Sequence, residues 1–229
     1  MDYTYKDISK MIDHSLLNPT LTVDQLEIGI QISLDYDVAS VCIIPYYLKQ
    51  CVERLAGSDV KAGTTIGFPQ GGQATAIKVA EAKQALLDGG EELDMVVNIS
   101  KVLSGDWDFV RADLKAVIEV THEYGQKIKV IFENCYLNDT QKIKLCQICS
   151  DLDADWVKTS TGYGTGGATD KDLILMRKHS PERVQVKAAG GVRTLDRLLE
   201  VRALGVSRCG ATATIKMLDE SKQRLGISH

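Results

Sequence analysis

Two lysines in the second half of the chain lie in short β-branched runs, and their positions suggest imine chemistry. Lys158 belongs to the run at residues 156–160 and Lys187 to the run at residues 184–188. If these runs are neighbouring parallel strands, about 4.8 Å separates their backbones, so the two amines come close together. A nearby ammonium and partial desolvation both favour the neutral amine, which can attack a carbonyl carbon. The pair alone leaves open which lysine is the nucleophile.

An aspartate in an earlier run is the candidate for acid–base chemistry. Asp94 lies in the run at residues 92–97. Cleavage of an aldol through an imine needs proton transfers at a hydroxyl and at an enamine carbon, and a carboxylate can relay them directly or through a water molecule. The alternative is that Asp94 only pairs with a lysine. The two roles are compatible, because pairing would position the carboxylate.

Glycine-rich stretches at residues 161–167, 190–192 and 210–214 follow the last three runs, and they favour anion binding. Glycine permits positive φ and close backbone approach, and the N-termini of the helices expected after two of these stretches attract anions. Together with the lysines and threonine hydroxyls they suit a phosphorylated sugar, with plain turns as the alternative. The candidate phosphate-binding residues are Gly162, Gly190, Gly191, Gly210, Ala211, Thr212 and Ala213.

The elements that must position these residues alternate regularly between strands and helices. The expected strands span residues 11–14, 40–44, 63–68, 92–97, 129–133, 156–160, 184–188 and 207–210. The expected helices span residues 23–34, 47–55, 74–87, 108–124, 139–152, 171–178, 195–203 and 212–224, with a short helix at 5–10 that we expect to close the barrel bottom. Eight unbroken units predict an α/β fold with a closed (β/α)₈ TIM barrel, as a single domain over residues 1–229.

Alternation within the expected strands points ionisable side chains toward one interior. Successive strand residues face opposite sides, so apolar neighbours facing the helices leave the charged residues inside. The residues placed inside in this way are Asp94, Lys129, Glu133, Lys158 and Lys187. A structural barrel core would instead hold layers of Val, Ile and Leu, and burying charges without a purpose is costly. Buried ion pairs with no chemistry are the alternative.

Composition limits the classes of protein to consider. A net charge of −4 argues against a nucleic-acid binder. The sequence has neither an apolar run of about 18 residues nor a signal-peptide core, so we expect a soluble, cytoplasmic protein without membrane contact. Cys146 and Cys149 form a C-x-x-C without a second pair, which indicates buried helix thiols rather than a metal or redox site. We therefore expect no metal and no cofactor.

Around the candidate catalytic and phosphate-binding residues, the sequence resembles the deoxyribose-phosphate aldolase family, and the similarity runs from about residue 12 to residue 213. Six ordered segments carry the similarity: IDHSLL at 12–17, IGFP at 66–69, LDMVVN at 93–98, VKTSTG at 157–162, GGAT at 166–169 and VKAAGGVRT at 186–194. The VKTSTG segment and the K-x-x-G-G-V-R-T segment are specific when they occur together.

The resemblance implies a class I aldolase that reversibly splits 2-deoxy-D-ribose 5-phosphate into D-glyceraldehyde 3-phosphate and acetaldehyde. It implies that Lys158 forms the Schiff base, that Lys187 lowers its pKa and that Asp94 serves the proton relay. The family's phosphate loops correspond to Gly162, to residues 190–191 and to residues 210–213. The implied partners are the sugar phosphate and aldehyde substrates. Members of the family are often dimers, so a homodimer or higher homo-oligomer is an open alternative to a monomer.

Seven further residues are candidates for the pocket wall: Ser15, Cys42, Phe68, Lys129, Glu133, Thr159 and Arg193. Cys42 is expected mainly to pack. Phe68 either contacts the substrate's carbon chain or fills the barrel mouth, and Arg193 either reaches the phosphate or braces its loop.

Two departures from the family pattern leave alternative functions open. The family often has serines after the last strand, where this chain has Ala211, Thr212 and Ala213, and some members use a C-terminal tyrosine that residues 226–229 lack. One alternative is a Schiff-base aldolase acting on a different, unphosphorylated sugar. The others are a non-catalytic sugar-phosphate-binding barrel and a metal-free sugar-phosphate isomerase.

Overall fold

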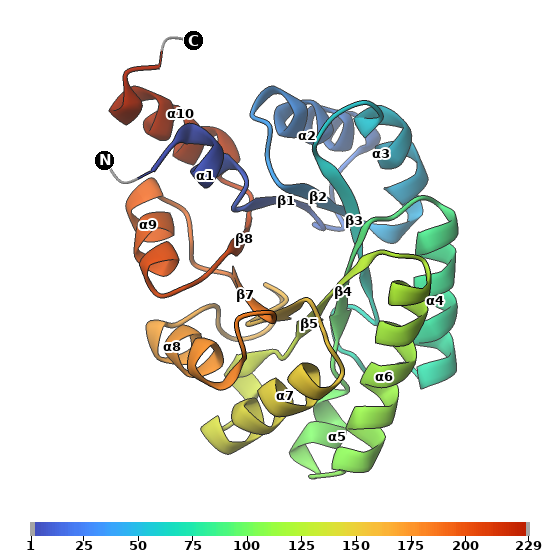
Figure 1. Ribbon diagram of the computed structural model, residues 1–229. Coiled ribbons are helices and arrows are strands. Elements are labelled where there is room, and N and C mark those ends of the chain that lie inside the picture. The colour runs from blue at the N-terminus through green and yellow to red at the C-terminus, as the bar shows by residue number, and fades with distance from the viewer. Residues whose placement is uncertain (1–2, 228–229) are drawn as a thin grey trace.

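Eight parallel strands form a closed barrel, and the helices between them surround it (Figure 1). The structure, a computed structural model, describes residues 3–227, so the last two residues of the stretch without a tyrosine lie outside it. The strands follow one another in chain order, and the last pairs with the first through Asp13 and Gly210. The predicted (β/α)₈ barrel is therefore confirmed.

Each of the eight expected strands is present, with ends that differ by a few residues from those predicted. The strands are β1 (Ile12–Leu16), β2 (Ser40–Ile43), β3 (Lys61–Ile66), β4 (Glu92–Val96), β5 (Lys127–Ile131), β6 (Trp156–Lys158), β7 (Gln185–Ala189) and β8 (Arg208–Ala211). The largest errors are at β3 and β5, each shifted by two residues at both ends, and the errors at the ends of β5 and β6 bear on site residues. Glu133 has a φ of 56°, in the left-handed region, so β5 ends before it. The chain after Lys158 forms a loop rather than two more strand residues.

The expected helices are also present, and several begin at side chains that cap their first turn. They are α1 (Tyr5–Ser9), α2 (Val23–Asp35), α3 (Leu48–Leu55), α4 (Thr75–Leu87), α6 (Trp107–Glu123), α7 (Asp139–Asp151), α8 (Asp170–His179), α9 (Leu195–Ala203) and α10 (Thr214–Leu225). Thr22 caps α2 and Asn138 caps α7, each in a capping box with a glutamine three residues on. The prediction missed α5 (Ile99–Leu103), a single turn capped by Asn98, and two 3₁₀ turns, η1 (Pro45–Tyr47) and η2 (Asn134–Tyr136).

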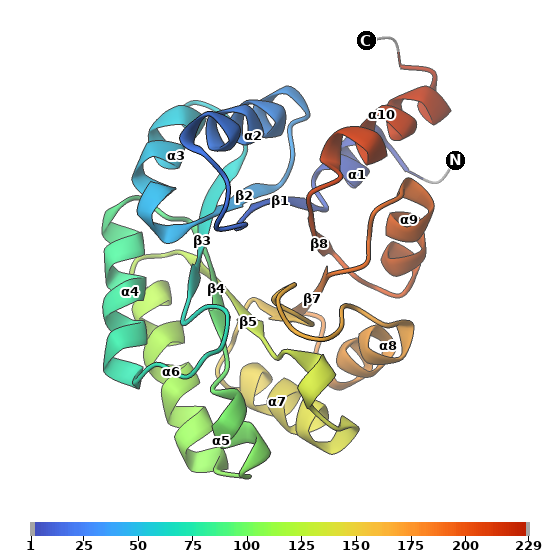
Figure 2. The same cartoon turned by 180° about the vertical axis from the view of Figure 1, so that it is seen from behind.

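The short helix α1 does not close the barrel bottom as predicted. Both views show it at the periphery, beside α10 (Figures 1 and 2). Its Ile8 is buried, and the Tyr5 hydroxyl donates a hydrogen bond of 2.9 Å to the carbonyl of Tyr36 at the end of α2. At the amino-terminal ends of the strands, the indole N–H of Trp156, the first residue of β6, donates to Ser207 just before β8 over 3.0 Å.

The apolar core lies between the barrel and its helices, as the alternation within strands predicts. The strand residues expected to face the helices belong to this core, and each is fully buried: Leu93, Met95, Val130, Phe132, Val157 and Val186. Their charged neighbours contact one another inside the barrel. The sheet therefore separates an apolar outer layer from a polar interior.

Two further features bear on the expectations from composition. Cys146 and Cys149 are both buried on α7, as expected for helix thiols, and residues 3–227 contain no group of three side chains suited to holding a metal ion. None of the helices in this range combines the length and the apolar character needed to cross a membrane.

A buried ion pair joins α4 to α6 and generates a stability prediction. Lys78 Nζ donates to Asp113 over 2.7 Å and to the Val96 carbonyl over 3.1 Å, and Lys78 has no exposed surface. Asp113→Ala leaves this ammonium buried without its carboxylate. We expect the free energy of unfolding, measured by urea denaturation, to fall by about 3–5 kcal/mol.

The matched control is Glu119→Ala. It breaks a half-exposed ion pair between Glu119 and Lys115, which lie one turn apart on the same helix, α6. We expect it to cost about 0.5 kcal/mol or less, because water screens exposed pairs. Equal effects of the two substitutions would contradict a stabilising role for the Lys78–Asp113 pair.

Candidate active site

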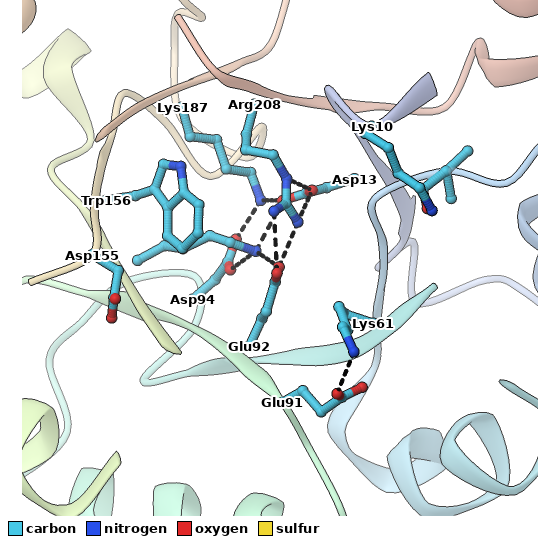
Figure 3. Close-up of polar contacts among 12 residues, drawn as sticks. Lys10, Asp13, Lys61, Glu91, Glu92, Asp94, Asp155, Trp156, Lys187 and Arg208 are labelled. Atoms are coloured by element: carbon cyan, nitrogen blue, oxygen red, sulfur yellow. Dashed lines mark hydrogen bonds and ion pairs between the residues drawn. The ribbon is translucent and has the colours of Figure 1, made fainter. Parts of the chain in front are cut away.

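The barrel interior holds seven ionisable side chains from six strands, and each is at most 9% exposed. Figure 3 shows the labelled members converging on the centre of the barrel. The seven are Asp13 on β1, Glu92 and Asp94 on β4, Lys129 on β5, Lys158 on β6, Lys187 on β7 and Arg208 on β8. Such a concentration of buried charge is far from the apolar filling of a structural barrel core.

Asp94 brings together the two lysines predicted to act as a pair. Lys158 and Lys187 are register partners on neighbouring strands. The Nζ atoms of both donate to the same Asp94 oxygen, Oδ2, each over 2.7 Å. The other oxygen, Oδ1, lies 3.2 Å from Nζ of Lys129. The sequence predicted this proximity, and the structure adds that one carboxylate oxygen serves both amines.

The surroundings of the two lysines separate their proton affinities. Burial lowers the pKa of Lys158, and the charge of Lys187 lowers it further, against the opposing effect of Asp94. Burial also disfavours the charged form of Lys187, but the carboxylates of Asp13 and Asp94 outweigh it and raise its pKa. Lys158 is therefore the amine that loses its proton more readily, which makes it the candidate nucleophile of the pair.

Asp94 stays ionised despite its complete burial. Burial alone would raise its pKa, but Lys129, Lys158 and Lys187 together hold the pKa below its ordinary value. A carboxylate in this state can accept a proton and can hold an amine in position.

Three charged residues that the sequence analysis gave no role complete the lower part of the cluster. Asp13 accepts from Nε of Arg208 over 2.6 Å and from Lys129 over 2.9 Å, and it also pairs with Lys187. Glu92 accepts from Arg208 over 2.6 Å and from Lys129 over 2.5 Å. Alternation could have found them, because Glu92 shares its face with Asp94.

A cavity of about 610 Å³ opens above this cluster, at the carboxyl ends of the strands. Both Lys158 and Lys187 line it, as does Asp13, whereas Asp94 lies behind the two lysines and is not part of the lining. Of the candidates for phosphate binding and the pocket wall, those in its lining are Ser15, Cys42, Gly162, Gly190, Gly191, Arg193, Gly210, Ala211 and Thr212. The structure thus gathers the two candidate lysines and most of the predicted loop residues around one space.

Five candidates lie elsewhere, three of them within the barrel or its loops. Lys129 lies below the cavity, paired with Asp13, Glu92 and Asp94. The Thr159 hydroxyl is engaged with the backbone of Ala189, accepting from its N–H over 3.0 Å. Expecting Lys129 and Thr159 in the wall was therefore wrong, since both side chains are already committed to buried partners.

Glu133 was also expected in the wall, but it holds the loop after β6. Its carboxylate accepts hydrogen bonds from the backbone N–H of Thr161, over 3.2 Å, and from the Thr161 hydroxyl. The left-handed backbone at Glu133 accompanies this contact. The buried carboxylate is therefore an anchor for the glycine-rich segment rather than part of the lining.

The remaining two candidates are at the edges of the site. Phe68 lines a neighbouring cavity of about 540 Å³ and meets the Tyr163 ring edge to face, with 5.4 Å between ring centres. Ala213 precedes α10 and is absent from the lining of the main cavity. Neither therefore contacts the space next to Lys158.

Two residues without a predicted role in the site also line the main cavity. The Tyr163 hydroxyl donates to the Leu17 carbonyl over 2.6 Å, linking the loops after β6 and β1. The other is His14, whose Nδ1 lies 2.7 Å from the Thr214 hydroxyl. Burial lowers the pKa of His14 to about 4, so it is neutral near pH 7.

The chain has clear relatives among known proteins. The model of the DeoC/LacD family aldolases matches residues 8–212. A deoxyribose-phosphate aldolase of Rhodopirellula baltica is 67% identical over 226 residues, which cover 99% of this chain and 94% of that protein. One from Thermococcus gammatolerans is 43% identical over 218 residues, covering 94% and 97%.

Solved structures show the same similarity. A structure named QR15, an aldolase, superposes with a TM-score of 0.91 at 34% identity and covers 97% of this chain and 99% of that one. The tetrameric deoxyribose phosphate aldolase from Aeropyrum pernix gives a TM-score of 0.86 at 26% identity, with 96% and 93% covered.

Close backbone packing between the loops after β6 and β7 generates a second prediction. Gly190 has a φ of 81°, and a Cβ there would lie 2.9 Å from Cα of Gly167. Gly190→Ala therefore adds a backbone strain of about 1–2 kcal/mol and a steric clash. We expect the free energy of unfolding to fall by at least about 2 kcal/mol in urea denaturation.

Two other glycines separate these effects. Gly57 has a φ of 83° with open space around it, so Gly57→Ala should cost only the strain, about 1 kcal/mol. Gly72 has neither a positive φ nor a neighbour within 4 Å, so Gly72→Ala should be neutral within about 0.5 kcal/mol. A Gly190→Ala variant as stable as Gly57→Ala would disprove the tight packing between the loops.

Proposed function

The chain belongs to the DeoC/LacD family of aldolases, and from this premise we propose that it is a class I aldolase that reversibly cleaves 2-deoxy-D-ribose 5-phosphate to D-glyceraldehyde 3-phosphate and acetaldehyde. One observation carries the proposal: two buried lysines that line the main cavity share one oxygen of Asp94. A lysine with a lowered pKa beside a second cation is suited to forming an imine.

In the proposed mechanism, the neutral amine of Lys158 attacks the C1 aldehyde, and loss of water gives a protonated imine. The carboxylate of Asp94, acting through a water molecule, takes the proton of the C3 hydroxyl as the C2–C3 bond breaks. The electron pair of that bond moves into the imine, which becomes an enamine, and glyceraldehyde 3-phosphate leaves. Protonation of the enamine at C2 and hydrolysis then release acetaldehyde and the free amine.

Lys187 has two roles in this proposal. Its positive charge disfavours a proton on Lys158, which increases the fraction of nucleophilic amine at neutral pH. Its own ammonium is held by Asp13 and Asp94, so it stays charged at the cavity floor. There it favours binding of an anionic substrate.

The loops after β6, β7 and β8 are proposed to bind the phosphate. Gly162, Gly190 and Gly191 all have positive φ and line the cavity. The N-terminus of α10, directly after the loop at residues 212–213, has no side-chain cap, so its first N–H groups are available to an anion. The hydroxyl of Thr212 and the guanidinium of Arg193 are candidate additional donors.

A homo-oligomeric state and a cytoplasmic location complete the proposal. The aldolase from Aeropyrum pernix that shares this fold is a tetramer. All six cysteines of the present chain are free thiols, which is typical of a reducing compartment.

The Schiff-base assignment predicts where a trapped adduct forms. Incubation with acetaldehyde and sodium borohydride should reduce the imine and leave an ethyl group on Lys158, because this lysine is the one with the lowered pKa. Peptide mass mapping measures the position of the adduct. Lys158→Met should show no stoichiometric label and no cleavage activity.

Exposed lysines provide the internal control for the trap. Lys61, which pairs with Glu91 at the surface and has a raised pKa, should stay unmodified under conditions that fully label Lys158. Stoichiometric label on Lys187, or on no lysine, would refute the mechanism.

The phosphate loops predict how strongly the enzyme depends on the 5-phosphate. We expect kcat/KM for 2-deoxyribose 5-phosphate to exceed that for 2-deoxyribose by about 100-fold or more, since one hydrogen bond to a charged group contributes about 1.5–3 kcal/mol. Steady-state kinetics with both sugars, each at saturating and limiting concentrations, measures the ratio. Equal values would instead favour an aldolase of unphosphorylated sugars.

A further inference from the structure

The buried cluster contains more basic groups than acidic ones. Its three carboxylates and four basic side chains contact one another inside the closed sheet, away from bulk water, and Figure 3 labels five of them, namely Asp13, Glu92, Asp94, Lys187 and Arg208. The members are Asp13, Glu92, Asp94, Lys129, Lys158, Lys187 and Arg208. If all seven were charged, the interior would carry one unbalanced positive charge, which is costly in a medium of low dielectric constant.

The ion pairs are distributed unevenly among the four basic groups. Lys129 contacts all three carboxylates. Arg208 contacts Asp13 and Glu92, and Lys187 contacts Asp13 and Asp94. Within the described part of the chain, Lys158 pairs with Asp94 alone, through the oxygen that Lys187 also uses.

The other titratable groups around Lys158 do not compensate this charge. Cys42 on β2 is buried, and burial raises the pKa of its thiol to about 11, so it is neutral near pH 7. His14 is also neutral near pH 7, because burial lowers the pKa of its ring to about 4. Tyr163, also in the cavity wall, has a raised pKa because of burial and is an uncharged phenol. Arg193 at the rim adds a further positive charge rather than a negative one.

We propose that Arg208 and Glu92 are positioning residues that set the charge balance of the barrel interior and so keep Lys158 in its neutral, nucleophilic form. Neither residue is in the lining of the cavity, so each acts through its partners rather than on the substrate. This inference rests on the function proposed for Lys158.

The four basic groups differ in how readily each can release its proton. A guanidinium stays charged under all physiological conditions, and Lys129 is held by three carboxylates. With Lys187 held by two, these three cations match the three carboxylates. A proton on Lys158 would be the fourth positive charge and the one with the fewest partners. The raised pKa values of Lys187, Lys129 and Arg208 and the lowered pKa of Lys158 have the directions that this count requires.

Removing one charge at a time tests whether the charge balance sets the protonation of Lys158. The two single variants must then shift the pKa of Lys158 in opposite directions. Arg208→Met removes a cation, so a proton on Lys158 would balance the interior and the pKa of Lys158 should rise. Glu92→Gln removes an anion without changing the side-chain shape, so the pKa of Lys158 should fall. Each shift should be about one pH unit, the size expected for one charge at about 10 Å in a protein.

Two further variants are the matched controls. Arg208→Lys keeps the charge, and the double variant Arg208→Met/Glu92→Gln removes one charge of each sign. Both should leave the pKa of Lys158 within about 0.3 units of the wild-type value, since the charge balance is unchanged. If Arg208 and Glu92 had a merely structural role, the double variant would lose more activity than either single variant. The two single variants would then not shift the pKa of Lys158 in opposite directions.

The measurement reads the amine directly. Competitive labelling with acetic anhydride over a range of pH, followed by mass mapping of the peptide that contains Lys158, gives its pKa without substrate. The pH profile of kcat/KM provides a second readout. Its acid limb should move to higher pH in Arg208→Met and to lower pH in Glu92→Gln, because Lys158 reacts only above its pKa.

Shifts in the same direction, or no shift in either single variant, would overturn the proposal. Because the labelling needs no turnover, this failure is distinguishable from a failure of the proposed function, which the borohydride trap detects. Thermal unfolding checks that each variant is folded. If Arg208→Met does not fold, Glu92→Gln must still lower the pKa of Lys158 and Arg208→Lys must leave it unchanged.

Discussion

The centre of this barrel depends on one shared atom, Oδ2 of Asp94, which accepts hydrogen bonds from Lys158 and Lys187. Two ammonium groups on a single oxygen repel each other, so the less well paired amine holds its proton more weakly. This repulsion is effective because the closed sheet buries both amines almost completely and so leaves their charges poorly screened. The fold therefore both places the two amines together and buries them deeply enough for one to affect the other.

The regular succession of strand and helix patterns was enough to predict the barrel, and alternation within strands was enough to predict that Asp94, Lys158 and Lys187 face its interior. Leu93 and Met95 belong to the outer core, which leaves Asp94 facing inward, and the same reasoning places Lys158 and Lys187 inside. The lower members of the cluster could not be assigned roles in this way. Their contacts depend on the stagger between strands, which sets the depth of each side chain in the barrel, and a pattern of apolar and polar residues does not contain that stagger.

The ends of the strands were harder to predict, and errors there misplaced two side chains. Continuing β5 to Glu133 pointed this carboxylate into the barrel, whereas a left-handed backbone turns it onto the amide of Thr161. The prediction also extended β6 beyond Lys158 and placed Thr159 in the pocket wall, whereas the Thr159 hydroxyl accepts a hydrogen bond from the backbone of Ala189. In both places the backbone conformation depends on contacts with residues of a neighbouring loop. Those residues are distant in the sequence, so no local sequence pattern indicates the contacts.

Closure of the sheet between β1 and β8 has a consequence for the growing polypeptide. Asp13 is synthesised near the beginning of the chain and Arg208 near its end, yet they are joined by hydrogen bonds across the barrel. Until β8 has emerged from the ribosome, Asp13 and Glu92 lack their guanidinium partner, and the last gap in the wall stays open to water. The nascent protein therefore completes the buried charge cluster around Lys158 only at the final stage of assembly, when the first and last strands meet.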